Sequence, residues 1–222
     1  MEKNTELEII QMENAIVLER PEISTEIKKQ VMGMQELMEM SKFMAKSTIV
    51  PLLFQNRPEN CYIALDLASR MDLSPMMVMQ NLYVIQGKPS FSGSFIGALI
   101  RSDAQFKNVE LVYVGDKDAN GEYSINEKYG AYVRAIRTRD GSEVRGGTVT
   151  LRIAKAEGWT TKTGSKWLTI PTIMLAHRAY AWFGRQHCPE LLMGMQMQDE
   201  VYDIIEQGEP TGTKNPYISG DK

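Results

Sequence analysis

The fold class is decided by residues 131–153, which read AYVRAIRTRDGSEVRGGTVTLRI. This stretch predicts two strands, residues 131–139 and 148–153, joined through the turn formers Asp140 and Gly141. In the second strand apolar residues alternate with polar ones. The apolar residues are Val149, Leu151 and Ile153. One face of this strand is therefore expected to pack and the other to be wet, as in an antiparallel sheet exposed on one side.

Helical patterns lie on both sides of this β-rich centre. Residues 170–186 have strong helical spacing, with Pro171 near the start, where a missing N–H is tolerated. Residues 92–102 also have helical spacing, whereas residues 109–114 alternate like a strand. Helices and a small set of antiparallel strands together predict an α+β fold.

The N-terminal part is expected to be helical, with one helix over residues 5–18 and a long helix over residues 22–46. The long helix carries two apolar stripes, which together are wider than one core face needs. It is therefore a candidate contact between protomers, and a fully buried core helix is the alternative. The stripes are Ile27, Val31, Met34 and Met38 on one side and Leu37, Met40 and Met44 on the other.

Shorter elements are expected between and after these segments. Residues 59–71 and 76–80 read as helices, and Ser74 and Pro75 favour the start of the second one. Residues 82–91 read as a hairpin that turns at Gly87-Lys88. An acidic helix is expected from Asp199 to Glu206.

The chain has 222 residues, which suits one globular domain with appended helices. We expect an N-terminal helical segment over residues 1–46 and a core domain over residues 47–206. Residues 207–222 are rich in Gly and Pro and are expected to be a flexible tail.

The composition favours a cytoplasmic protein. No stretch of about 18 uncharged apolar residues is present, so no transmembrane helix is expected. The acidic start, MEKNTELEII, does not resemble a signal peptide. Two cysteines, Cys61 and Cys188, are too few for a disulfide framework. A bacterial cytoplasm is the expected location, and no membrane partner is expected.

Charge is strongly segregated along the chain. Residues 1–41 hold nine acids and four bases, and residues 188–222 hold seven acids and two bases. Residues 130–187 hold ten bases and three acids. A basic block between acidic ends suggests a polyanionic partner. The alternative is that the bases are solvated or pair with the acidic ends.

Motifs for bond chemistry are mostly missing. The sequence has no phosphate-binding GxxxxGK[ST], no nucleophile elbow and no HExxH. His177, His187 and Cys188 lie close in sequence, but no second Cys pair accompanies them for zinc. We therefore expect no catalytic residue, no metal, no cofactor and no enzymatic activity. A metal-dependent nuclease is a weak alternative, because scattered acids could hold Mg²⁺.

The segment 167–201 carries the strongest functional pattern. On a helix, Arg178, Trp182 and Arg185 share one face. Cations bind phosphates, and an aromatic ring offers a base a stacking surface, so this stripe suits a nucleic acid strand. The alternative for Trp182 is a place in the core, with the arginines extending past it.

The order of these residues resembles the RecT/Redβ superfamily of phage single-strand annealing proteins. Upstream, Asp72-Leu73-Ser74-Pro75 is followed by the hairpin and by the helix over residues 92–102. The resemblance spans residues 58–204, and Ser94-Phe95 departs from the Gly-Trp that the family often has. The downstream matches are Trp167, Pro171, Met174, Leu175, His177, Arg178, Ala179, Arg185, Gly194 and Asp199-Glu200.

This resemblance implies a small antiparallel sheet packed on a long helix, flanked by N- and C-terminal helices. It also implies a homo-oligomer, a ring or a helical filament, that holds single-stranded DNA in a basic groove. The protein would pair that strand with its complement without ATP during phage homologous recombination, through an annealed duplex intermediate. Family members often have a C-terminal domain that binds a phage exonuclease or the host single-strand-binding protein, so both are candidate partners.

The resemblance matches Arg178 and Arg185 to basic helix residues that contact the DNA backbone. Arg134 and Arg137 have opposite parity on one strand, so at most one of them is expected to line the groove. Three tryptophans are candidate aromatic contacts with DNA, and burial in the core is the favoured alternative for each. They are Trp159, Trp167 and Trp182. The other candidate DNA contacts are Arg139, Arg152, Lys162 and Lys166.

Two other functions stay open. A single-stranded DNA-binding protein could protect strands without pairing them. An oligomeric structural protein could pair its basic strip with its own acidic ends, and it would not bind DNA even at low salt.

Overall fold

The computed structural model describes residues 25–85, 87–161 and 163–205, and side chains between residues 33 and 203. By its contacts the chain divides into two compact units, residues 1–67 and 68–222, whereas the sequence placed a boundary after residue 46. The expected helix over residues 5–18, the tail over residues 207–222 and Lys162 lie outside the described residues.

The first unit contains α2 (Thr25–Ala45) and most of α3 (Pro58–Met71), which confirms both predicted helices. The loop between them is tied to each helix by hydrogen bonds. Asn56 N donates to Ala45 O at 2.7 Å, and Asn60 Nδ2 donates to Leu53 O at 2.8 Å. Phe54 is fully buried in this loop. These contacts explain why the first unit extends beyond α2 into α3.

The second unit has a small three-stranded sheet made of β1 (Leu82–Ile85), β2 (Lys88–Phe91) and β7 (Gln196–Met197). The helix α4 (Pro75–Asn81) precedes β1, and the helix α5 (Gly93–Ser102) follows β2. The strands β1 and β2 form the predicted antiparallel hairpin, and β7 joins β2 in parallel. Ser92 begins α5, because its hydroxyl accepts a hydrogen bond from Phe95 N at 3.2 Å.

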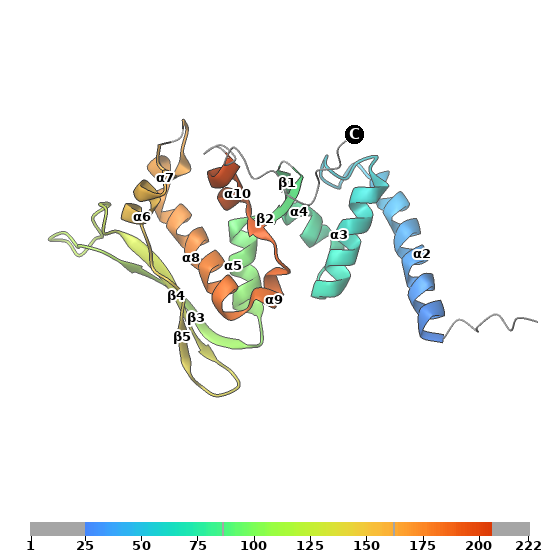
Figure 1. Cartoon of the computed structure of the whole chain (residues 1–222), viewed down its shortest axis with the longest axis horizontal. Helices are drawn as coiled ribbons and strands as arrows, with labels where there is room; N and C mark the ends of the chain where they lie inside the picture. The colour runs from blue at the N-terminus through green and yellow to red at the C-terminus, as the bar shows by residue number, and fades with distance from the viewer. Residues whose placement is uncertain (1–24, 86, 162, 206–222) are drawn as a thin grey trace, which may run out of the picture. The chain divides into compact units, whose positions relative to one another are not determined.

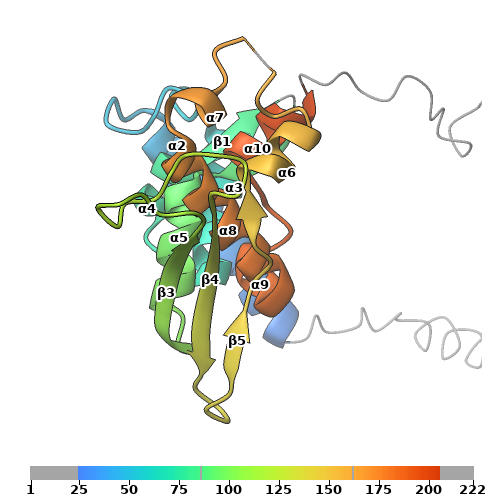
Figure 2. The same cartoon turned by 90° about the vertical axis from the view of Figure 1, so that its left-hand side faces the viewer.

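The larger sheet is antiparallel, and its strands are β3 (Phe106–Val114), β4 (Gly130–Arg137), β5 (Glu143–Arg145) and β6 (Val149–Thr150). β4 lies between β3 on one edge and both β5 and β6 on the other. Figure 2 shows this arrangement with the sheet toward the viewer. The predicted antiparallel sheet is therefore present.

The prediction of a strand over residues 148–153 is wrong after Thr150. The chain turns there into the helix α6 (Leu151–Ala156), and the Thr150 hydroxyl caps it by accepting a hydrogen bond from Ile153 N. The expected common face of Val149, Leu151 and Ile153 therefore does not form. A Thr that suits a strand also suits a helix cap, so alternation alone did not distinguish them.

The long helix α8 (Pro171–His187) is the centre of the second unit. In Figure 1 the larger sheet lies on one side of α8 and α5 lies on the other. Phe183 of α8 meets Phe106 of β3 edge to face, with ring centroids 5.2 Å apart. A Cβ on Gly93 of α5 would lie 2.4 Å from the His177 ring, so the close approach of α5 to α8 requires glycine. This packing confirms the predicted small sheet on a long helix.

Three short helices surround α8, namely α7 (Lys166–Thr169), α9 (Pro189–Leu192) and α10 (Gln198–Ile205). The helix α10 confirms the predicted acidic helix. None of the helices in the described part of the chain has the length and apolar character to cross a membrane.

Candidate functional site

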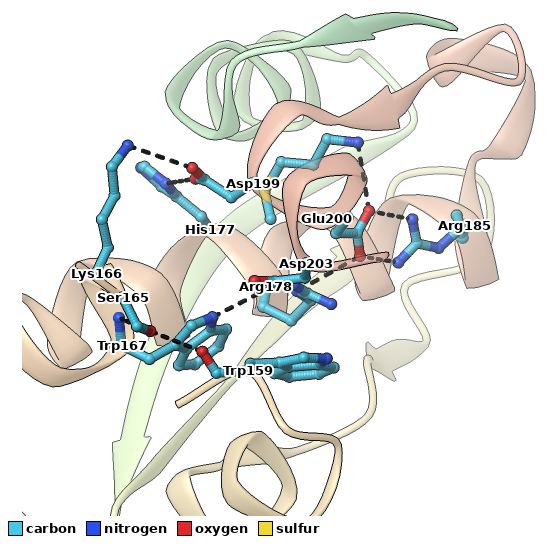
Figure 3. A network of polar contacts seen from close by, with 11 residues as sticks. Trp159, Ser165, Lys166, Trp167, His177, Arg178, Arg185, Asp199, Glu200 and Asp203 are labelled. Carbon is cyan, nitrogen blue, oxygen red and sulfur yellow. Dashed lines mark hydrogen bonds and ion pairs between the residues drawn. The ribbon is translucent and has the colours of Figure 1, made fainter. Parts of the chain in front are cut away.

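The predicted basic residues of α8 lie in a polar network with the acidic helix α10 (Figure 3). Arg178 is only 5% exposed. Its Cζ lies 3.9 Å from the ring centroid of Trp159 and 5.6 Å from that of Trp167. Its Nη2 donates a hydrogen bond to Asp203, which also accepts one from Trp167 Nε1 at 3.2 Å. The guanidinium is thus enclosed by two aromatic rings and a carboxylate.

Arg185 forms a two-bond pair with Glu200 of α10. Its Nη1 lies 2.6 Å from Oε2, and its Nη2 donates to Oε1. These hydrogen bonds raise the pKa of Arg185, against the effect of its partial burial. Glu200 also accepts the backbone N–H of Met197 at 3.3 Å. The Arg185 side chain is 42% exposed and that of Glu200 only 6%, so the open side of this pair is the arginine.

Asp199 of α10 contacts two further basic side chains, those of His177 and Lys166. His177 Nδ1 lies 3.2 Å from its Oδ2, and Lys166 Nζ lies 3.5 Å from its Oδ1. Burial alone would raise the pKa of Asp199. The hydrogen bond with His177 and the charge of Lys166 outweigh burial and hold that pKa below its ordinary value. Asp199 is therefore a carboxylate at neutral pH.

The network leaves one polar atom unsatisfied. Arg178 Nε is buried and has no hydrogen-bond partner among the described residues, although Glu200 Oε1 is 3.5 Å away. Burial lowers the pKa of Arg178, and the charges of Glu200 and Asp203 oppose that change. Because desolvating these charges costs about as much as their attraction returns, the network is a weak source of stability for its size.

The structure covers part of the α8 stripe, which was expected to contact DNA. Arg178 does not face solvent, so a DNA backbone cannot reach it while α10 is in place. Trp159 and Trp167 are buried, as their core alternative had it. Trp182 is half-buried over Gly147, where a Cβ would lie 3.0 Å from its ring.

The arginines of β4 face opposite ways, as their parity predicts. Arg134 is paired across the sheet with Glu110, with Nη2 and Oε2 2.7 Å apart. Arg137 pairs in register with the buried Phe106, so it lies on the side that faces α8. Arg137 forms no ion pair with any described residue, whereas Arg134 is neutralised by its partner.

Two other predicted cations lie beyond the strands. Arg139 is exposed and binds Asp140 at 3.0 Å. The pKa of Asp140 falls to about 2, because the Ser142 hydroxyl and backbone N–H donate to it and Arg139 adds its own hydrogen bond. Arg152 is exposed on α6 near the charge of Glu127. These two side chains and Lys166, which is 58% exposed, stay accessible from solvent.

An open hollow of about 430 Å³ lies where β4 ends beside the last turn of α8. Its polar lining includes Arg137, Arg139, Gln105 and His187, and Phe106 supplies an aromatic wall. His187 Nε2 lies 3.0 Å from the carbonyl oxygen of Arg145, to which it donates in the matching tautomer. The hollow therefore collects two predicted arginines together with Gln105 and His187, neither of which the sequence indicated as a DNA contact.

Arg145 is a further cation that sequence reasoning counted in the basic block but did not select. Its Cζ lies 3.7 Å from the ring centroid of Tyr132, and its Nη2 donates to Thr148 Oγ1 at 2.6 Å. It has no carboxylate partner within the described ranges. The register that pairs Arg145 with Arg134 could not be read from the sequence, because it depends on how the β4–β5 turn closes.

The described residues offer neither a metal site nor a reactive thiol. Within the described part of the chain, no three His, Cys, Asp or Glu side chains converge to hold a metal ion. Cys188 is buried, and burial raises its pKa to about 12, with the charges of Asp103 and Glu190 adding to the effect. The thiol is therefore protonated and a poor nucleophile.

Comparison of the sequence with protein-family models and with curated proteins found no match.

Proposed function

We propose that this protein binds single-stranded DNA through its backbone and anneals it to a complementary strand without ATP. The protein would act as an assembly of several copies. The exposed methionines of α2, Met34, Met38 and Met40, are candidates for contacts between copies, because each is about half exposed. A phage exonuclease and the host single-strand-binding protein are the proposed protein partners.

The observation that carries the proposal is the hollow beside the end of α8. Arg137 is half-buried there and has no acidic partner among the described residues, and Arg139 and His187 line the same space. A partly buried cation without a counter-charge favours an anionic ligand, since the ligand restores what desolvation costs. Phosphate contacts of this kind are independent of base sequence, as annealing requires.

Annealing needs no bond chemistry, so the proposal is consistent with the lack of enzyme motifs. Two strands repel each other through their phosphates until cations neutralise that charge. Once neutralised and aligned, they gain about 1.4 kcal/mol for each base-pair step that stacks. Arg137, Arg139, Arg145 and Arg152 would supply the cations while leaving the bases free to pair.

The first prediction concerns Arg137 and is tested by annealing two complementary fluorescent oligonucleotides without ATP. The wild-type protein is expected to accelerate pairing. Arg137→Ala is expected to slow it roughly tenfold, because a phosphate contact is lost. Arg134→Ala is the matched control: it removes the same charge from the same strand, but from the opposite face and from a side chain already paired with Glu110.

Equal losses in the two variants would show that overall charge, and not the hollow, governs annealing. Binding of DNA without faster pairing would favour a protein that only protects single strands.

One observation favours a different function. Arg178, Arg185 and Lys166 pair with acids of α10, as expected of a structural protein whose basic strip pairs with its own acidic end. Such a protein would not bind DNA at low salt, so the binding measurement separates the two functions.

A further inference from the structure

Most of the buried side chains described on α10 are acids. Asp199, Glu200 and Asp203 are each at most 8% exposed. Val201 is the buried apolar residue among the side chains described on this helix. A surface helix usually buries an apolar stripe. Among the side chains described on α10, carboxylates therefore supply most of the buried contacts, beside the packing of the helix on β1, β2 and β7.

The acids of α10 contact four side chains that we call the cation strip: Lys166, His177, Arg178 and Arg185. The two-bond pair of Arg185 with Glu200 has the geometry that a guanidinium also adopts with a phosphate. The carboxylates thus occupy positions that phosphate oxygens of a DNA backbone would take.

The fit between α10 and the cation strip is incomplete. Arg178 Nε has no hydrogen-bond partner within the described residues, as noted above. A cavity of about 350 Å³ adjoins Arg178 and is lined in part by Arg178, Arg185, Gly194 and Glu200. A buried N–H that α10 does not satisfy is available to an acceptor that arrives when the carboxylates move.

We propose that α10 is an internal competitor of DNA: it covers a second backbone-binding site, the cation strip, and a bound single strand displaces it. This inference rests on the proposed function. Competition is reciprocal, so DNA must weaken the docking of α10 by the same factor by which α10 weakens DNA binding at the strip.

Amide hydrogen exchange of the full chain, with and without an oligothymidine of about 30 nucleotides, tests the proposal directly. With DNA, the amides of residues 198–205 are expected to exchange at least roughly tenfold faster. The amides of β4 are expected to keep their protection, since the core does not open.

Unchanged or slower exchange in α10 while DNA is bound would overturn the displacement of α10 and leave the proposed function standing. Failure to bind DNA at low salt would instead overturn the proposed function itself.

A charge variant gives an independent test. Asp199→Asn frees Lys166 and His177 while it leaves the buried contacts of Arg178 in place. Affinity for the same oligothymidine is expected to rise roughly tenfold. Glu122→Gln is the control, because it removes one negative charge from an exposed loop outside the network. A rise no greater than that of the control would contradict the proposal.

Discussion

At the scale of single residues, Arg178 shows most clearly what spacing can and cannot predict. Its position with Trp182 and Arg185 on one helix face followed from the sequence. What covers that face depends on Asp203 and Glu200, which follow Arg178 by 25 and 22 residues and approach only through the tertiary fold. The opposite faces of Arg134 and Arg137, in contrast, could be predicted, because strand parity is a local property.

The buried contacts of Arg178 lead to a prediction on stability. Arg178→Met removes the guanidinium that faces the buried Asp203, which is expected to cost about 3–5 kcal/mol of unfolding free energy. The double variant Arg178→Met/Asp203→Asn removes both charges and keeps an oxygen for Trp167 Nε1, so it is expected to recover most of the loss. Urea unfolding measures both. A double variant no more stable than the single one would show that the ion pair is not the cause.

At the scale of elements, most helices and both hairpin strands of the small sheet were predictable from periodicity, caps and turns. The short elements β5, α7 and α9 were not predicted, and the change from β6 to α6 at Thr150 was predicted wrongly. Residues 148–153 alternate as a strand does. Thr150 pairs with Gly130, which is the first residue of β4, so the strand pairing ends after two residues. The two-residue strand β7 also was not predicted, because it exists only by pairing with β2, more than 100 residues earlier.

The cap of α6 can be tested by removing one hydroxyl. Thr150→Val keeps the shape of the side chain but loses the acceptor for Ile153 N, so unfolding free energy is expected to fall by about 1 kcal/mol. Thr138→Val, at an exposed position after β4, is the control and is expected to change stability by less than about 0.5 kcal/mol. Thermal or urea unfolding of both variants measures the two changes in stability. Equal effects would mean that the cap does not stabilise α6.

At the scale of the whole molecule, charge is distributed so that only part of the basic block meets acids within the fold. The acids of α10 neutralise the α8 arginines, whereas Arg137 and Arg145 have no carboxylate partner in the described ranges. The charge segregation could be read from the sequence, but the division of the bases into paired and unpaired sets could not. That division depends on which strands and helices become neighbours.

The most direct test of DNA-backbone binding is the affinity of the wild-type protein for an oligothymidine at increasing salt. If about four arginines release counterions from a single strand, affinity is expected to fall roughly 50-fold between 50 and 200 mM salt. A steep fall of this kind would support a basic backbone-binding surface. Affinity that does not change with salt, or no binding at 50 mM, would contradict it.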